Sequence, residues 1–171
     1  MGSRVVFLDV DGVLHPLSNG EPFQAACLLA FKQLLDRVDC DIVLSSSWRL
    51  DPDANTVLHR QFEKHGIFNK ISSCTPELET RSDEILAWLR QNPAYRYWVA
   101  LDDLDLSQES RCAEHVEIFR RHGVVTDEDR GLTPEDAQRA VVRLGEPCPV
   151  SPPPTLPCGC KDAEGPSNGP T

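Results

Sequence analysis

The sequence predicts an α/β domain built around a doubly wound parallel sheet. Three short apolar runs, at residues 5–8, 42–44 and 97–101, each end in a cluster of polar side chains. Apolar residues at helical spacing lie between the first two runs, and a second helical pattern precedes the third. Four consecutive large apolar residues fit a strand that is buried on both faces, as in parallel sheets. With 171 residues, 40% of them hydrophobic, the chain is long enough for one such domain.

The first apolar run ends in Asp9-Val10-Asp11-Gly12. Side chains two apart in an extended chain point to the same side, so both carboxylates face one small volume, and Gly12 lets the backbone turn sharply there. Two carboxylates at such close range need a compensating cation, and their hard oxygen donors suit Mg²⁺ best. These residues indicate a magnesium and phosphate site, although the tetrapeptide alone is equally typical of an ordinary Asp-Gly turn.

The next elements follow from apolar spacing and turn residues. The patterns predict a helix over 23–38, a strand over 42–44, a helix over 52–66 and a short strand that begins at 67–68. Gly66 suits the left-handed position that follows many helices. The opening of the chain therefore has the order strand, helix, strand, with polar residues at the carboxyl end of each strand.

The second half of the domain repeats this order. Ser82 is a candidate N-cap for a helix, because Asp83 and Glu84 would lie in the positive first turn of that helix. The patterns then predict a strand over 97–101 that ends at Asp102-Asp103, a helix that ends near 121, a strand over 124–125 and a helix over 133–144.

Residues 146–171 have a different composition, rich in Pro, Gly, Ser and Cys. Such a segment cannot bury enough apolar surface to order itself, so we expect a domain over 1–145 and a disordered tail over 146–171. The formal net charge of −10 opposes nonspecific binding to nucleic acid or to anionic membranes. Neither a transmembrane span nor a secretory signal is evident, and the seven cysteines lack framework spacing. We therefore expect a cytoplasmic protein with reduced thiols and no membrane partner.

Four motifs occur in order: Asp-x-Asp-Gly, a serine at the end of the second strand, a basic residue at a helix start, and Asp102-Asp103. This order resembles the haloacid-dehalogenase-like (HAD) phosphohydrolase superfamily over residues 5 to about 144. The segments 44–49 and 98–103 resemble the small HAD domains of some RNA-repair proteins, in which Ser or Thr two residues before a Trp ends the second strand. That alignment selects Ser46. The resemblance implies a Rossmann-like three-layer sandwich, and the short segments around Ser46 leave no room for a separate cap domain.

The resemblance implies a role for each aspartate at these strand ends. Asp9 would be the nucleophile that attacks phosphorus and carries an aspartyl-phosphate intermediate. Asp11 would be the general acid and base, and its backbone carbonyl would bind Mg²⁺. Asp9 and Asp102 would supply carboxylate ligands, with Asp103 either a further ligand or a group that orients the others.

The resemblance also implies two phosphate-binding side chains. Ser46 would hydrogen-bond a phosphoryl oxygen, with Ser45 and Ser47 as alternatives. The basic residue of the superfamily is more often Lys than Arg, and the candidates here are Arg81, near a helix start, and Lys70.

The neighbouring aromatic and basic residues receive no catalytic role from the sequence. Trp48 and Arg49 lie just outside the second strand, where substrate contact is conceivable but an aromatic usually packs against other side chains. The five histidines lack the spacing of metal ligands.

The resemblance leads to the expectation of a Mg²⁺-dependent phosphomonoester hydrolase. Superfamily members without caps often act on macromolecules, so the expected partner is a phosphorylated substrate, with nucleotide or nucleic-acid phosphate ends as one class. The alternative is a catalytically weak HAD-like module that binds phosphate or a phosphorylated protein. The natural substrate, the oligomeric state and the role of the tail do not follow from the sequence.

Overall fold

A single five-stranded sheet organises the computed structural model, which describes residues 3–18, 22–110 and 112–145. All four strand pairings are parallel, and the strand order is β3-β2-β1-β4-β5. The strands are β1 (Ser3–Leu8), β2 (Asp41–Leu44), β3 (Ile71–Cys74), β4 (Tyr95–Asp102) and β5 (Gly123–Val125). The prediction of an α/β fold with a central parallel sheet is confirmed.

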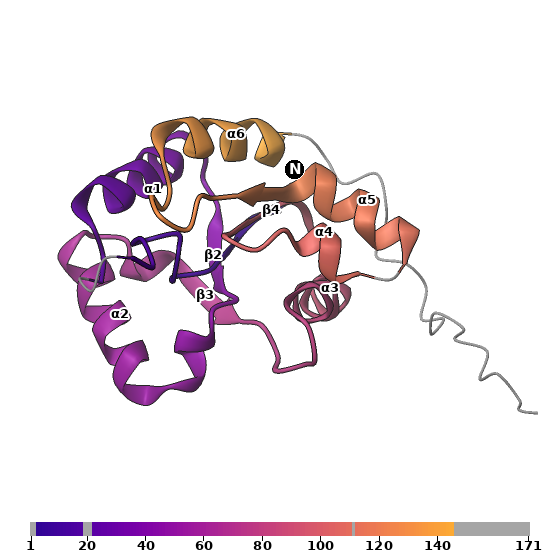
Figure 1. Ribbon diagram of the computed structural model, residues 1–171, viewed down its shortest axis with the longest axis horizontal. Coiled ribbons are helices and arrows are strands. Elements are labelled where there is room, and N and C mark those ends of the chain that lie inside the picture. Colours follow the sequence, from indigo (N-terminus) through magenta and orange to yellow (C-terminus); the bar gives the residue numbers. More distant parts are fainter. Residues whose placement is uncertain (1–2, 19–21, 111, 146–171) are drawn as a thin grey trace, which may run out of the picture.

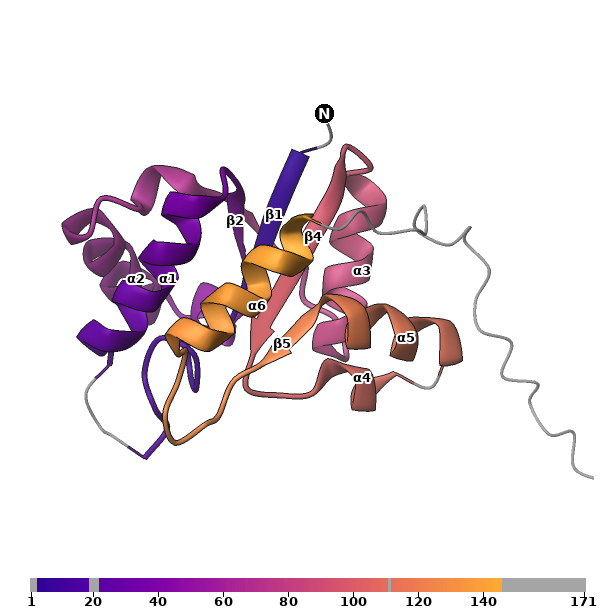
Figure 2. The same cartoon turned by 90° about the horizontal axis from the view of Figure 1, so that it is seen from above.

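Helices cover both faces of the sheet. They are α1 (Ala25–Arg37), α2 (Pro52–Lys64), α3 (Arg81–Gln91), α4 (Leu106–Glu109), α5 (Ala113–His122) and α6 (Pro134–Gly145), with 3₁₀ helices η1 (Ser47–Leu50) and η2 (Phe68–Lys70). Figures 1 and 2 show α1, α2 and α6 on one face and α3, α4 and α5 on the other. The result is the three-layer sandwich that the sequence predicts.

The alternation of side chains along the strands builds two cores. Val6 and Leu8 of β1 point into the core under α1, α2 and α6, whereas Val5 and Phe7 point into the core under α3, α4 and α5. All four side chains are fully buried. Because both faces of β1 are covered, its sequence is a continuous apolar run and does not alternate between apolar and polar residues.

The order of the strands fixes the position of the site. From β1 the chain builds outward to β2 and β3 on one side, and it then returns to add β4 and β5 on the other side. Leu8 of β1 pairs with Leu101 of β4, and the backbone N–H of Asp9 donates to the carbonyl of Leu101 at 3.0 Å. Asp9 and Asp102 therefore lie side by side at the carboxyl edge of the sheet, where the strand order reverses and where ligands bind in open α/β sheets.

Two local predictions are wrong. Ser82 does not cap α3: the side chain of Thr80 accepts from the backbone N–H of Asp83, so the helix begins at Arg81. Residues 67–68 do not begin a strand, because the chain first forms the 3₁₀ turn η2, and β3 begins at Ile71. Both errors concern boundaries, where a competing Thr cap and a short turn leave little trace in apolar spacing.

The predicted tail, 146–171, lies outside the described residues. Within the described residues, none of the helices has both the length and the apolar character that a membrane crossing requires.

Candidate active site

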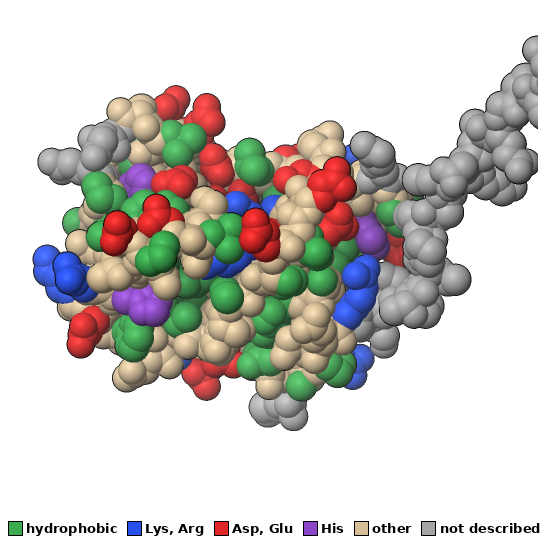
Figure 3. Space-filling view, turned by 90° about the horizontal axis from the view of Figure 1, so that it is seen from below, with side chains coloured by type: hydrophobic (Ala, Val, Ile, Leu, Met, Phe, Trp, Pro, Cys, Tyr) green, Lys and Arg blue, Asp and Glu red, His purple; other side chains and the backbone are tan. Residues whose placement is uncertain are grey.

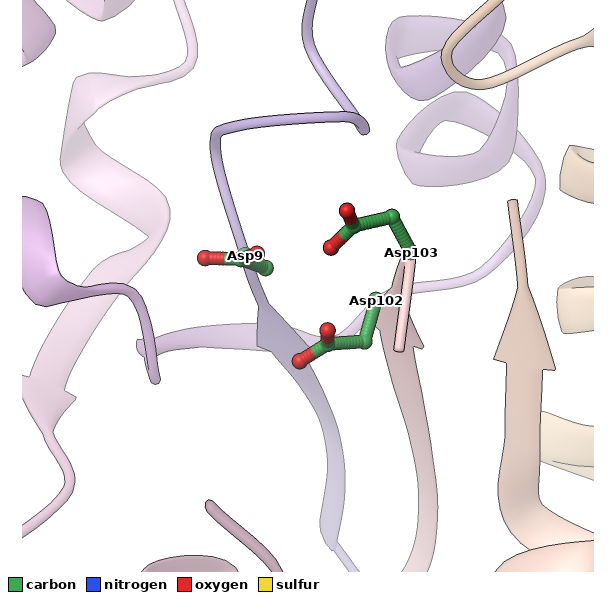
Figure 4. A group of neighbouring side chains, drawn as sticks. All are labelled: Asp9, Asp102 and Asp103. Atoms are coloured by element: carbon green, nitrogen blue, oxygen red, sulfur yellow. The ribbon is translucent and has the colours of Figure 1, made fainter. Parts of the chain in front are cut away.

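Three carboxylates converge at the carboxyl edge of the sheet. Asp9 follows β1, Asp102 is the last residue of β4 and Asp103 comes next, and Figure 4 shows their carboxylates turned toward one common volume. One oxygen from each carboxylate lies within 4.8 Å of the other two. Asp9 and Asp102 are buried, with 5% and 2% of their surface exposed, whereas Asp103 is half-buried.

The proximity of these carboxylates makes their ionised forms unfavourable. Burial, followed by the charge of Asp9, raises the pKa of Asp102 to about 8. The same two causes, in the same order, raise the pKa of Asp103. Burial and the neighbouring negative charges disfavour the ionised carboxylate. A cation bound at this position would favour the ionised form again.

One guanidinium group partly balances this charge. The Nη1 atom of Arg81 lies 2.8 Å from Oδ2 of Asp102 and 3.1 Å from Oδ1 of Asp9. Burial alone would lower the pKa of Arg81, but these two carboxylates raise it above its usual value. Arg81 is the first residue of α3. Because Thr80 caps this helix, the start of the helix, and Arg81 with it, lies beside the carboxylates.

Lys70, the alternative basic residue, lies elsewhere. It ends η2, just before β3, and Ile71 pairs with Ile42 near the start of β2. The Nζ atom of Lys70 donates to Asp39 at 3.0 Å. In a parallel sheet the strands all begin at one edge and end at the other. Lys70 lies where strands begin, so it is at the opposite edge of the sheet from the three carboxylates. The structure thus brings Arg81, and not Lys70, to the site.

The donor set fits a hard divalent cation. Three carboxylates supply oxygen atoms, which Mg²⁺ prefers, and a single Arg81 leaves their combined negative charge incompletely balanced. Sulfur and imidazole groups, which softer metals favour, are absent from this three-residue cluster.

Asp11 lies at the rim of the site, in the loop after β1. Its side chain is 43% exposed, so a substrate can reach it. Both of its carboxylate oxygens have partners: Nε2 of His15 lies 3.0 Å from Oδ1, and Nε1 of Trp48 donates to Oδ2 at 2.9 Å. Sequence patterns assign no role to His15 and favour simple packing for Trp48. The contact between His15 and Asp11 could be suspected from the sequence, because the two residues are only four positions apart. No feature of the sequence indicates the contact between Trp48 and Asp11.

Ser46 forms the turn between β2 and η1. It is fully buried, and its Oγ atom accepts a hydrogen bond from the backbone N–H of Trp48 at 3.3 Å. Its neighbours differ, since Ser45 is buried and continues the strand pairing with Leu8, whereas Ser47 is exposed. Because Ser46 uses its oxygen as an acceptor, the hydroxyl hydrogen stays available for a ligand.

Arg49 holds the carboxyl ends of β2 and β3 together. Its guanidinium donates to four backbone carbonyls and one carboxylate, those of Ser45, Ser46, Thr75, Pro76 and Glu84, at 2.8–3.0 Å. A guanidinium has five N–H donors, and these five contacts use all of them. Arg49 is therefore a structural support for the Ser46 turn and not a ligand for substrate.

Together, the reversal point of the parallel sheet, the Asp9 and Asp11 pair and the Asp102-Asp103 pair define a domain of the HAD-like class. The chain belongs to the family described as the HAD domain in Swiss Army Knife RNA repair proteins, whose model matches residues 5–137. The matched segment runs from β1 into α6 and contains every site residue described above. Neither a comparison with curated proteins nor one with solved structures gave a match.

Proposed function

We propose that this protein is a Mg²⁺-dependent phosphomonoester hydrolase that acts through an aspartyl-phosphate intermediate on Asp9. The observation that carries the proposal is the convergence of Asp9, Asp102 and Asp103 at the point where the strand order reverses. Family membership supports the reaction class, since HAD domains are generally phosphohydrolases.

In the first step, a carboxylate oxygen of Asp9 attacks phosphorus and the bond from phosphorus to the ester oxygen breaks. Asp11 gives a proton to the departing oxygen, so the leaving group departs as an alcohol. In the second step, water attacks phosphorus and Asp11 takes a proton from it. The bond to Asp9 breaks, which releases phosphate and restores the Asp9 carboxylate and the protonated form of Asp11. The half-exposed position of Asp11 fits this role, because a general acid must reach both the ester oxygen and water.

The cation would be held by the carboxylates of Asp9, Asp102 and Asp103 and by the backbone carbonyl of Asp11. When bound, Mg²⁺ would offset the negative charge that builds on the phosphoryl oxygens. The raised pKa of Asp102 supports this assignment, because a cation would relieve the repulsion that raises it.

Two side chains would bind the phosphoryl oxygens. Arg81 offers a planar guanidinium that can donate two parallel hydrogen bonds, and it already lies beside Asp9. Ser46 offers its hydroxyl hydrogen from the adjacent turn. Arg81 is already held beside Asp9 and Asp102, so it would bind the phosphoryl group with little loss of side-chain freedom.

We further propose that the substrate is a nucleotide or nucleic-acid phosphate end. The described residues between Asp11 and Ser46 form one loop, α1 and β2, which leaves the site without a cap and open to a bulky substrate. The family description, which refers to RNA repair proteins, supports this class. On the face shown in Figure 3, acidic side chains are spread over the upper half, whereas basic ones lie at the margins and in a small group near the centre. This distribution favours contact with a phosphate end over contact with a long phosphate backbone.

A substrate panel tests this assignment. Phosphate release would be measured with 5′- and 3′-phosphorylated RNA and DNA oligonucleotides, mononucleotides and sugar phosphates, each with Mg²⁺. We expect the highest kcat/KM on one class of oligonucleotide end. Equal activity on sugar phosphates would contradict the nucleic-acid assignment while leaving the reaction class in place. Retention of phosphorylated oligonucleotides without any turnover would favour a binding module instead.

A further inference from the structure

We propose that Trp48 and His15 are positioning residues that hold the Asp11 carboxylate in the orientation required for proton transfer. The inference rests on the proposed function, because it gives these two side chains a part in the protonation of the leaving group. It starts from the two hydrogen bonds that end on opposite oxygens of Asp11.

The two donors fix the plane of the carboxylate. Trp48 donates from Nε1 to Oδ2 at 2.9 Å, and Nε2 of His15 lies 3.0 Å from Oδ1. An indole N–H can only donate a hydrogen bond, so Trp48 must be the donor in its contact with Oδ2. With one donor on each oxygen, rotation of the carboxylate would break both hydrogen bonds, and a lone pair on each oxygen remains available to the substrate.

Asp11 needs such support more than Asp9 does. The Asp9 side chain is 7% exposed at the end of β1, whereas the Asp11 side chain is 43% exposed in a loop beyond the sheet. An exposed carboxylate on a loop samples several rotamers, and proton transfer requires one defined position within hydrogen-bonding distance of the ester oxygen.

The surroundings of His15 favour its role as a donor. Its side chain is only 9% exposed, and its Nδ1 atom has no hydrogen-bond partner among the residues that the structure describes. An imidazole with its proton on Nε2 leaves only an acceptor unpaired, whereas a proton on Nδ1 would bury an unpaired N–H. The neutral tautomer that donates to Asp11 therefore fits the burial best.

Aromatic packing fixes both donors. The rings of His15, Phe23 and Trp48 form a mutual cluster with centroid distances of 5.3–5.9 Å. Phe23 takes part despite a φ of +64°, a left-handed conformation that is uncommon outside glycine. Within the part of the chain that the structure describes, this strained backbone places the Phe23 ring against both residues that contact Asp11.

Trp48 also connects the proposed acid to the proposed phosphate-binding turn. Its backbone N–H donates to Oγ of Ser46, and its indole donates to Asp11. One residue therefore links the Ser46 turn, through its backbone, to the Asp11 carboxylate, through its indole.

The test compares two substrates with different leaving groups. An alkyl phosphate has a poor leaving group that needs protonation, whereas p-nitrophenyl phosphate has a good one that departs without it. Trp48→Phe keeps an aromatic side chain beside His15 and Phe23 but removes the indole N–H donor and part of the ring. We expect this substitution to lower kcat/KM on the alkyl phosphate by about ten- to a hundredfold and to leave kcat/KM on p-nitrophenyl phosphate within about threefold of wild type. The comparison uses kcat/KM because this quantity reports the departure of the leaving group and not the second step, in which Asp11 acts as the base. A purely structural role would lower both rates together.

Trp88→Phe is the matched control, because the indole of Trp88 donates to Ser73 at 2.9 Å and does not contact Asp11. His15→Gln retains a donor and should keep more activity on the alkyl phosphate than His15→Leu. Equal losses of activity on the two substrates, or the same selective loss in Trp88→Phe, would overturn this inference and leave the proposed function in place. A folded wild-type protein that hydrolyses neither substrate would overturn the proposed function, and this inference with it.

Discussion

A Cβ atom added at Gly12 would lie 2.6 Å from the Cβ atom of Asp103. Real Cβ atoms do not approach side chains this closely, and Gly12 also has a φ of +68°. The carbonyl of Gly12 accepts a hydrogen bond from Thr126 at 2.8 Å, which holds the loop against the end of β5. The absence of a side chain at Gly12 therefore allows the loop after β1 and the end of β4 to bring their carboxylates together.

Gly12→Ala is expected to displace Asp103 and to weaken Mg²⁺ binding. The left-handed backbone costs roughly 1 kcal/mol for alanine, and the clash adds roughly 1–3 kcal/mol. Gly66→Ala is the matched control, because Gly66 has a φ of +70° but no atom within 4 Å of its added Cβ. Urea unfolding and calorimetric titration with Mg²⁺ measure both effects. Equal loss of stability and unchanged Mg²⁺ affinity in the two variants would contradict the close packing described here.

Asp102 is expected to make the metal-free protein less stable as the pH rises. In the unfolded chain an aspartate has a pKa of roughly 4, whereas burial and Asp9 raise the pKa of Asp102 to about 8 in the fold. Between these values the folded state retains a proton that the unfolded state has lost. The free energy of unfolding therefore falls with rising pH, by at most about 1.4 kcal/mol per pH unit. Below roughly pH 4 this effect is absent, and above about pH 8 it is complete.

Asp102→Asn removes the titrating carboxyl group and keeps a side chain of similar size. We expect the variant in EDTA to gain stability relative to wild type as the pH is raised from about 5 to about 8. Added Mg²⁺ should stabilise wild type more than the variant, because the variant lacks one proposed ligand. Parallel pH profiles of the two proteins in EDTA would show that Asp102 titrates as it does in the unfolded chain, contrary to the account.

Arg81 and Lys70 give a direct comparison of the two candidate basic residues. Arg81→Ala removes a charge-assisted contact to phosphate and should lower kcat/KM by roughly ten- to a hundredfold. Lys70→Ala should leave kcat/KM unchanged, because Lys70 lies at the opposite edge of the sheet beside Asp39. Arg81→Lys should fall in between, since lysine keeps the charge without the planar pair of donors. A larger loss from Lys70→Ala than from Arg81→Ala would reverse the assignment.

The sheet and the cluster of aspartates could be predicted because they follow from regular patterns. Val5 to Leu8 form a continuous apolar run, which is typical of a strand covered on both faces, and the carboxyl ends of parallel strands lie at one edge. Once Asp9 and Asp102 are placed at strand ends, a doubly wound sheet brings them together. The order of the motifs carries the family resemblance, and that resemblance selects Ser46.

Other features of the site could not be predicted because they depend on side-chain contacts across loops. The choice between Arg81 and Lys70 requires the start of β3, and the η2 turn shifts that start to Ile71. The contact from Trp48 to Asp11 joins residues 37 apart in the chain and follows no periodicity. The five contacts of Arg49 likewise depend on how the ends of two strands approach one another.

Phosphate release from p-nitrophenyl phosphate is the first measurement to make on hydrolysis through Asp9. Wild type and Asp9→Asn would be measured in parallel with Mg²⁺ and with EDTA, after their folded state has been checked by circular dichroism. We expect wild type to release phosphate with Mg²⁺ but not with EDTA, and Asp9→Asn to lose at least about a thousandfold of this activity. Equal rates in the two proteins, or no release by folded wild type with Mg²⁺, would contradict hydrolysis through Asp9.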